Sequence, residues 1–329
     1  PYTDESRLNK ANKNIIKTED LLKLLGKTER FENVVLTDFR ECSEDNSTTA
    51  FSASVFRVSK AVSYVAYRGT DEKILSFYED AELAYAFPIT AQLASLSYIN
   101  YLMKKYETDF IAGGHSKGGN LAMFSFIFTS DENKKRIQTV YNNDGPGFPK
   151  DLAPLLFTPE NCKKIINISP EDAIVGRMLE TCGKNIIVKS SAAAVSQHNL
   201  FTWILNGSKF ERAENYSMLS NYVEDTLTNS LESLPPDDLK KTVNKIYEIA
   251  KKSGLNTLDD INKSNYSNII SSVIQTSGQE TGAGNETKEI LKVLTKNLIN
   301  SVDIEKRLPE IDLKRIKEFI ENRKKKEDA

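Results

Sequence analysis

The sequence predicts an α/β protein with a doubly wound, mostly parallel sheet, followed by an all-helical C-terminal region. Two observations predict the sheet. Extended and helical segments alternate between residues 62 and 190, and a short apolar run leads through glycines into a long apolar helix. That junction reads "DFIAGGHSKGGNLAMFSFIF", residues 109–128. A third observation predicts the helical region, because strand-like segments stop after Phe210.

The N-terminal part should contain a helix and three strands. Residues 1–30 are polar and helical in pattern, and "TEDLLKLLG" begins at the capping residue Thr18 and ends at Gly26. Three extended segments rich in β-branched and aromatic residues follow, with "ECSEDNST" and "SK" as turns between them. We expect these strands at 33–39, 49–58 and 61–67.

The middle of the chain alternates between the two kinds of element. Such alternation is typical of a parallel sheet covered by helices on both faces. We expect helices and strands in the following order: helices at 77–84 and 89–106, a strand at 109–113, a helix at 117–129, strands at 137–143 and 163–169, a further helix, and a strand at 185–190.

The C-terminal part has only helical patterns. Acidic or Asn starts and the stop at Gly254 agree with helix boundaries, and "SGQETGAGNE" separates two of the segments. We therefore divide the chain into an α/β domain of residues 1–210 and a helical region of residues 211–329. The expected C-terminal helices lie at 236–254, 258–276, 285–302 and 312–326.

Composition limits the classes of partner. Lys and Arg number 44 against 46 Asp and Glu, a formal charge of −2, which predicts neither nucleic acid nor an anionic membrane as partner. No apolar run approaches the roughly 20 residues that span a bilayer, so we expect no transmembrane segment. Cys42, Cys162 and Cys182 show no metal-like spacing and are interpreted as free thiols of a cytoplasmic protein. With only two histidines, a histidine-rich metal site is not expected, and we expect no cofactor because the chemistry of a serine hydrolase needs none.

The glycine-rich junction contains a G-x-S-x-G pentapeptide, residues 114–118, between an expected strand and an expected helix. At such a turn the serine is held in a strained conformation, with its hydroxyl above the sheet edge. Crowding there forbids side chains at Gly114 and Gly118. The following helix N-terminus offers amides and a positive dipole end to a developing oxyanion. Ser116 is therefore predicted to be a nucleophile.

Two other interpretations of this junction are weaker. A glycine-rich turn with an incidental serine would not need both the strand and the helix around it. A phosphate-binding loop would also use glycines at a helix start, but it would end in G-K-[S/T]. Here Lys117 precedes the last glycines and no Ser or Thr follows them.

A serine nucleophile needs a base and an acid. His115 lies inside the turn and points away, which leaves His198 in "AVSQHNLFTW", after the last expected strand. The acid should follow a strand between them. Asp172 in "INISPEDAIVG" is our choice, since its strand is nearer the histidine segment. Asp144 in "VYNNDGPGF" is expected to shape the pocket, and Asp151 is a weaker option on a surface loop.

The oxyanion needs two amide donors. One is the N–H of the residue after the nucleophile, Lys117. The other is expected in "VSYVAYRGTD", where Gly69 lets the backbone come close and Thr70 offers its N–H, with its hydroxyl as a further donor. An ordinary turn at a strand end explains this second segment equally well.

These segments together resemble a known family. "YRGTD", "GGHSKGGNLA", "SPEDAIVGRML" and "SQHNLFTW" are similar, in this order, to the motif blocks of class 3 (fungal-type) lipases. The G-H-S-K-G-G-N form with "NDGPGF" and "QH" is more similar still to an uncharacterised bacterial α/β-hydrolase family. The resemblance covers residues 62–205 and implies an α/β-hydrolase-like fold with a nucleophile elbow. It implies the roles already assigned to Ser116, Asp172, His198, Thr70 and Lys117.

The sequence departs from the lipase pattern at two positions. Lys117 replaces the usual leucine and is expected to put a positive charge at the site mouth. Asp71 replaces a small or polar residue. Both favour a polar or charged substrate over a lipid.

The predicted function is that of a serine hydrolase acting on a small ester or thioester through an acyl-enzyme. The same triad would serve acyl transfer or amide cleavage. A hypothesis from another class is a binding module that has kept the fold and lost the chemistry. The presence of all three triad members in the sequence favours catalysis.

Overall fold

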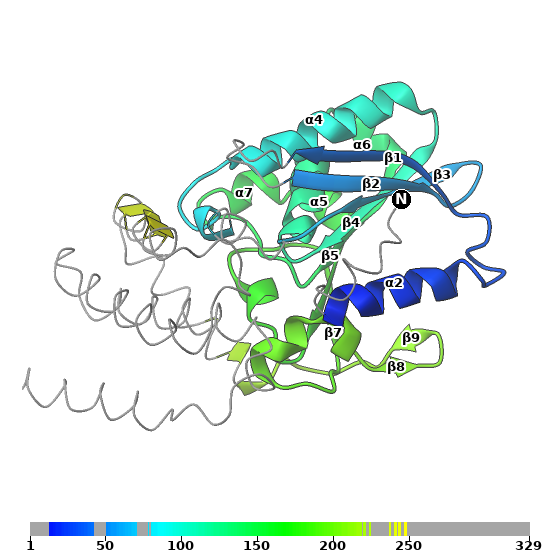
Figure 1. Ribbon diagram of the computed structural model, residues 1–329. Helices are drawn as coiled ribbons and strands as arrows, with labels where there is room; N and C mark the ends of the chain where they lie inside the picture. Colours follow the sequence, from blue (N-terminus) through cyan, green and yellow to red (C-terminus); the bar gives the residue numbers. More distant parts are fainter. Residues whose placement is uncertain are drawn as a thin grey trace, which may run out of the picture. The chain divides into compact units, whose positions relative to one another are not determined.

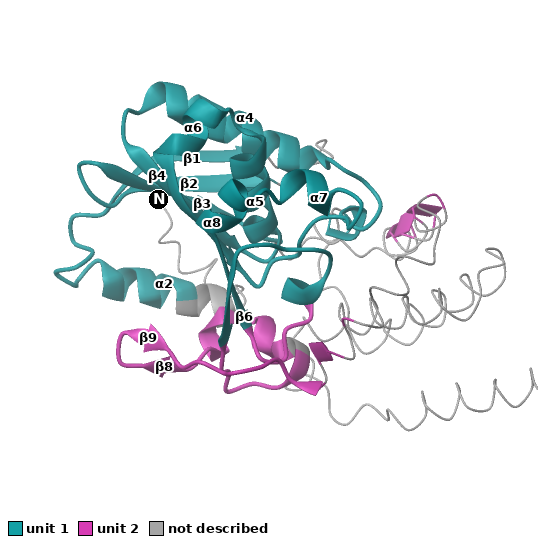
Figure 2. Ribbon diagram, turned by 180° about the vertical axis from the view of Figure 1, so that it is seen from behind, with its two compact units in different colours: residues 1–71, 75–169, 175–187 teal, residues 72–74, 170–174, 188–329 magenta. Residues whose placement is uncertain are grey.

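The computed structural model describes residues 13–42, 51–70, 78, 80–218, 220, 221, 224, 237, 240, 241, 243, 244, 247 and 248. The chain forms two compact units, which Figure 2 shows in separate colours. The first contains residues 1–71, 75–169 and 175–187, and the second contains residues 72–74, 170–174 and 188–329. The predicted division at residue 210 stays a prediction, because most of the chain beyond it lies outside the described residues.

The first unit is organised around a seven-stranded sheet whose strands follow one another in chain order. The first three strands pair antiparallel, and the pairs from the third to the sixth are parallel. The predicted α/β class with a mostly parallel sheet is thus confirmed. The strands are β1 (Val35–Cys42), β2 (Phe51–Arg57), β3 (Val62–Tyr67), β4 (Asp109–His115), β5 (Ile137–Asn143), β6 (Ile165–Pro170) and β7 (Lys184–Val188).

Apart from α2, which precedes β1, the helices of the first unit connect these strands. Right-handed crossovers between adjacent parallel strands place successive helices on one face, and α4 and α5 do lie next to each other against the sheet (Figure 1). The helices are α2 (Lys13–Leu25), α4 (Thr90–Lys105), α5 (Lys117–Phe128), α6 (Asp131–Arg136), α7 (Ala153–Leu156) and α8 (Pro159–Lys164), with the 3₁₀ turn η1 (Val175–Arg177).

Helix α5 is the centre of the core. Its sequence is apolar on every side, which is typical of a helix surrounded by protein, and every residue from 117 to 127 is buried. It packs on β3, β4, β5 and α4. The start of this helix, where the candidate nucleophile lies, is therefore held by the most densely packed part of the unit.

Several predicted boundaries differ from the structure. β4 continues to His115 instead of ending at Gly113. Lys163 and Lys164, predicted as strand, are the end of α8. The helix expected after β6 is only the 3₁₀ turn η1. Apolar periodicity locates an element well, but its end depends on capping contacts that periodicity does not report.

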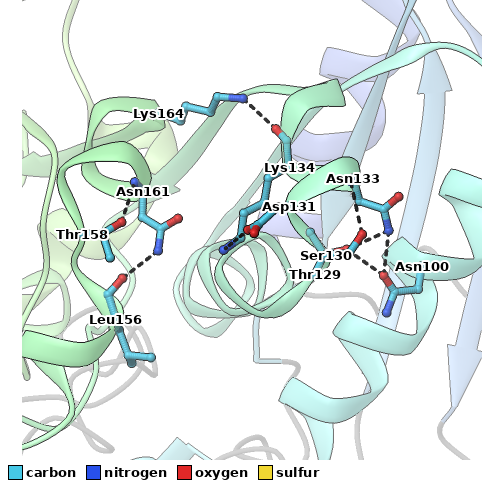
Figure 3. Close-up of polar contacts among 10 residues, drawn as sticks. All are labelled: Asn100, Thr129, Ser130, Asp131, Asn133, Lys134, Leu156, Thr158, Asn161 and Lys164. Atoms are coloured by element: carbon cyan, nitrogen blue, oxygen red, sulfur yellow. Dashed lines mark hydrogen bonds and ion pairs between the residues drawn. The ribbon is translucent and has the colours of Figure 1, made fainter.

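Those capping contacts are visible where α6 and α8 begin (Figure 3). The Ser130 hydroxyl accepts the N–H of Asn133, and the Thr158 hydroxyl accepts the N–H of Asn161, so each satisfies an amide of the first helical turn. The ammonium of Lys164 donates to the carbonyls of Lys134 and Ile137. These contacts fix the loops that lead into β5 and β6.

The prediction of free thiols is wrong for two of the three cysteines. Cys162 and Cys182 form a disulfide, with Cα atoms 5.3 Å apart. They are 20 positions apart in the sequence. Only the folding of α8 against the segment before β7 brings them together. The inference of a reducing, cytoplasmic environment rested on free thiols and loses that support.

The second unit is described mainly between residues 188 and 218. Its elements are short: the 3₁₀ turns η2 (Ala194–His198) and η3 (Leu200–Thr202), and a hairpin of β8 (Leu205–Asn206) and β9 (Lys209–Phe210). Trp203 packs edge-on against Phe210 and is buried. The expected C-terminal helices lie almost entirely outside the described residues. None of the helices that the structure describes is long and apolar enough to cross a membrane.

Candidate active site

Ser116 occupies the sharp turn between β4 and α5. Its backbone has φ 57° and ψ −132°, a region that residues with side chains rarely adopt and that is enriched at functional sites. The turn is held on both sides: the Ser116 N–H donates to the carbonyl of Asn143, and its own carbonyl accepts the N–H of Gly119. The strained serine thus lies between strand and helix, where the sequence predicted a nucleophile elbow, and we call this turn the elbow.

The two glycines of the pentapeptide are required by close backbone approach, as predicted. A Cβ on Gly114 would lie 2.4 Å from the carbonyl carbon of Gly118 and 2.6 Å from the carbonyl oxygen of Tyr67. A Cβ on Gly118 would lie 2.2 Å from that same Tyr67 oxygen. The start of α5 is therefore packed directly on the end of β3.

The turn after β3 lies against the elbow. β3 and β4 are parallel neighbours with Tyr67 paired to Gly114, so both chains leave the sheet at the same edge. A Cβ on Gly69 would lie 2.4 Å from the carbonyl oxygen of His115 and 3.4 Å from the Cβ of Ser116. The structure thus brings the segment of Thr70 next to the candidate nucleophile, as an oxyanion turn requires.

The side chain of Lys117 does not lie at the mouth of the site, and this expectation is wrong. Lys117 is 1% exposed, and its ammonium lies 3.5 Å from Oδ1 of Asp80. The hydroxyl of Thr70 donates to Oδ2 of the same carboxylate. Lys117 therefore gives no reason to expect a charged substrate, and Asp71, the second departure from the lipase pattern, lies outside the described residues.

A second strained residue follows β5. Asp144 is buried and has φ 49°. Its N–H donates to the carbonyl of Ile168, and its Oδ1 accepts the N–H of Gly176. A Cβ on its neighbour Gly145 would lie 2.3 Å from the carbonyl oxygen of Ser116. The loop of Asp144 therefore packs on the elbow, whereas Asp151 is exposed on the turn beyond it.

Buried amide side chains support this loop, and sequence reasoning missed them. Asn120 donates to the carbonyls of Pro146 and Gly147 and accepts from Nε2 of Gln92. Asn142 exchanges hydrogen bonds with Gly145 in both directions. The signal was present, because an amide inside the apolar run "GGNLAMFSFIF" needs buried partners.

A tyrosine lies on β3 close to the backbone that precedes the elbow. A Cβ on Gly113 would lie 2.3 Å from the hydroxyl oxygen of Tyr64. Burial, with a smaller effect of Tyr141, raises the pKa of Tyr64 to about 12. The Tyr64 hydroxyl therefore stays protonated at neutral pH and is not a candidate for the general base.

The predicted acid and base both belong to the second unit. His198 is the last residue of η2. Oδ2 of Asp172 accepts the N–H of Ala194 at 2.8 Å and Nε2 of Gln197 at 2.9 Å. The structure thus fastens the segment of Asp172 to the turn that carries His198. Thr70, Ser116 and Lys117 lie together in the first unit.

Metal chemistry has no obvious ligand set in the described part of the chain. No group of three or more His, Cys, Asp or Glu side chains among those residues is placed to bind a metal ion.

A strained serine between strand and helix, crowded by glycines at the carboxyl end of a central strand of a mostly parallel sheet, is the arrangement typical of the α/β-hydrolase class of fold. The model of the Mbeg1-like family matches residues 25–248, which is more than half of the chain. The chain belongs to the Mbeg1-like family. None of the curated proteins compared with it matches.

Several solved structures are similar to the chain at low identity. Lip2 lipase from Yarrowia lipolytica is 13% identical, with 54% of this chain and 80% of the lipase covered and a TM-score of 0.34. The Rhizomucor miehei lipase propeptide complex is 14% identical, with 49% of this chain and 58% of the lipase chain covered and a TM-score of 0.36. The carboxylesterase EstE1, cloned from a metagenomic library, is 13% identical, with 66% of this chain and 98% of the esterase covered and a TM-score of 0.28. TM-scores this low support no conclusion about activity.

Proposed function

We propose that the chain is a serine hydrolase that cleaves a small ester or thioester through an acyl-enzyme. The observation that carries this proposal is the conformation of Ser116, which holds φ 57° between a strand and a fully buried helix. A turn residue with no chemical role has no reason to keep a strained non-glycine backbone where glycine would fit.

In this mechanism Oγ of Ser116 attacks the substrate carbonyl carbon while His198 takes the hydroxyl proton. Asp172 holds the imidazole in its productive tautomer. The N–H groups of Thr70 and Lys117 bind the oxyanion of the tetrahedral intermediate, to which the N-terminus of α5 adds a favourable dipole. His198 then protonates the departing alcohol or thiol, and a water molecule attacks the acyl-enzyme in the same way. No cofactor takes part.

The direct test is labelling by a fluorophosphonate probe, which reacts covalently with an activated serine. The wild type should label and Ser116→Ala should not. Ser59→Ala, which removes an exposed turn serine, is the matched control and should label like the wild type. Circular dichroism checks that all three proteins are folded. Equal labelling of wild type and Ser116→Ala, or no labelling of a folded wild type, would contradict the proposal.

A further inference from the structure

Asp80 joins the elbow to the turn after β3. One oxygen of its carboxylate faces the ammonium of Lys117 at 3.5 Å, and the other accepts the hydroxyl of Thr70. The Lys117 side chain is 1% exposed, whereas Asp80 is 28% exposed. The carboxylate thus contacts the first residue of α5 on one side and the residue after Gly69 on the other.

The charge of Lys117 determines the ionisation state of Asp80 and, through it, the direction of the hydrogen bond with Thr70. A buried ammonium costs several kcal/mol unless an anion compensates it, so Lys117 strongly favours an ionised carboxylate at position 80. An ionised carboxylate can only accept hydrogen bonds. The Thr70 hydroxyl must therefore give its proton to Asp80 and cannot also donate it to a substrate oxyanion. This leaves the N–H of Thr70 as its donor.

We propose that Asp80 and the Lys117 side chain are positioning residues that clamp the Thr70 turn onto the elbow. Lys117 then acts twice: its backbone N–H binds the oxyanion, and its side chain holds the partner donor in place through Asp80. The clamp rests on the proposed function, and it assigns the Thr70 hydroxyl the role of an anchor rather than the donor role that the sequence suggested.

A double-mutant cycle on an activated ester tests the clamp. Asp80→Asn removes the carboxylate that faces the buried Lys117 ammonium and should lower kcat by about 10²-fold, as for the loss of one oxyanion donor, with KM changed by less than about twofold. In Asp80→Asn/Lys117→Met the cation is gone and the amide oxygen can accept from Thr70. The double variant should recover at least about tenfold of that loss and match Lys117→Met.

The Thr70 variants provide an independent readout. Thr70→Ser keeps the hydroxyl and should lose less kcat than the isosteric Thr70→Val, which should lose as much as Asp80→Asn. The matched control is the surface pair Asp131 and Lys134 (Figure 3), 3.7 Å apart with Asp131 96% exposed, where Asp131→Asn/Lys134→Met should be additive.

Additive losses at positions 80 and 117, or full kcat in Thr70→Val, would overturn the clamp. Melting temperatures of the same cycle separate this result from a failure of the proposed function. If a folded wild type neither labels nor hydrolyses, the proposed function and the catalytic role of the clamp both fall. In that case, if the effects of the Asp80 and Lys117 substitutions on melting temperature were simply additive, the ion pair between these two side chains would also be absent.

Discussion

Asp172 and Gln197 hold each other through two hydrogen bonds of opposite direction. The Asp172 N–H donates to Oε1 of Gln197 at 3.0 Å, and Nε2 of Gln197 donates to Oδ2 of Asp172 at 2.9 Å. Gln197 is 3% exposed, and its Nε2 also donates to the carbonyl of Ala192. The backbone carbonyl of Gln197 accepts the indole N–H of Trp203. One buried amide therefore sets the position of the predicted acid relative to the turn that ends in the predicted base.

Replacing this amide should impair turnover more than binding. Gln197→Leu keeps the side-chain volume but leaves the half-buried Asp172 N–H and Ala192 carbonyl without this partner, at up to about 1–3 kcal/mol for each group. A misplaced acid should lower kcat about 10²-fold with KM little changed. The control is Gln138→Leu, which removes an exposed amide bonded to Asp109 and should keep both constants. Unchanged kcat in folded Gln197→Leu would show that this contact does not position the acid.

Two aspartates, Asp172 and Asp144, can be compared directly as candidates for the acid of the predicted triad. We expect Asp172→Asn to lose roughly 10⁴-fold in turnover, because the asparagine would hold the imidazole in the wrong tautomer, as the same substitution does in serine proteases. Asp144→Asn should lose about tenfold if it only braces its loop through Gly176. Hydrolysis of an activated ester at matched melting temperatures measures both. If Asp144→Asn is the inactive variant, the role passes to Asp144 and the Ser116–His198 pair stands.

Adding one methyl group at the elbow should destabilise the fold. The Cβ of Gly118→Ala would meet the Tyr67 oxygen at 2.2 Å and the Gly69 nitrogen at 3.0 Å, both backbone atoms that cannot turn aside. We expect a loss of about 3 kcal/mol in the free energy of unfolding. At Gly26 the nearest atom is 3.6 Å away, so Gly26→Ala should stay within about 0.5 kcal/mol. Urea denaturation compares the two variants, and equal midpoints would be inconsistent with a crowded elbow.

The contact between β1 and α4 should make stability depend on pH in the acid range. Burial by itself raises the pKa of Asp38, but hydrogen bonds from Lys105 and Tyr98 and the charge of Lys105 outweigh it and lower the pKa. A lowered folded-state pKa gives stability that is complete above the unfolded value of about 3.9 and is lost as pH falls through the folded value.

Asp38→Asn should therefore melt below the wild type at pH 7, and the difference should shrink as pH falls below about 4. Melting temperatures between pH 7 and pH 3 measure this change. Asp131→Asn, at a surface ion pair, is the control and should show little difference at any pH. A difference that persists unchanged at pH 3 would mean that the Asp38 charge is not what stabilises the contact.

Prediction from the sequence succeeded where the cause is local. The strand, the glycines and the helix around Ser116 are neighbours in the chain, so the pattern contained the crowding that the structure shows. It succeeded less well at element ends and failed for Cys162 and Cys182, which are neighbours only in space. It also missed Asp80, whose segment shows no pattern that points to Lys117.

The sequence by itself determined the order of the elements and the strained turn at Ser116, because apolar periodicity and glycine spacing act over a few residues. Only the tertiary structure decided that the Lys117 ammonium turns inward to Asp80, that Asn120 supports the loop at Gly147, and that Gln197 holds Asp172. The physical reason is that a buried charge or amide must find its partner wherever packing brings one. That partner is set by the register of elements far apart in the chain.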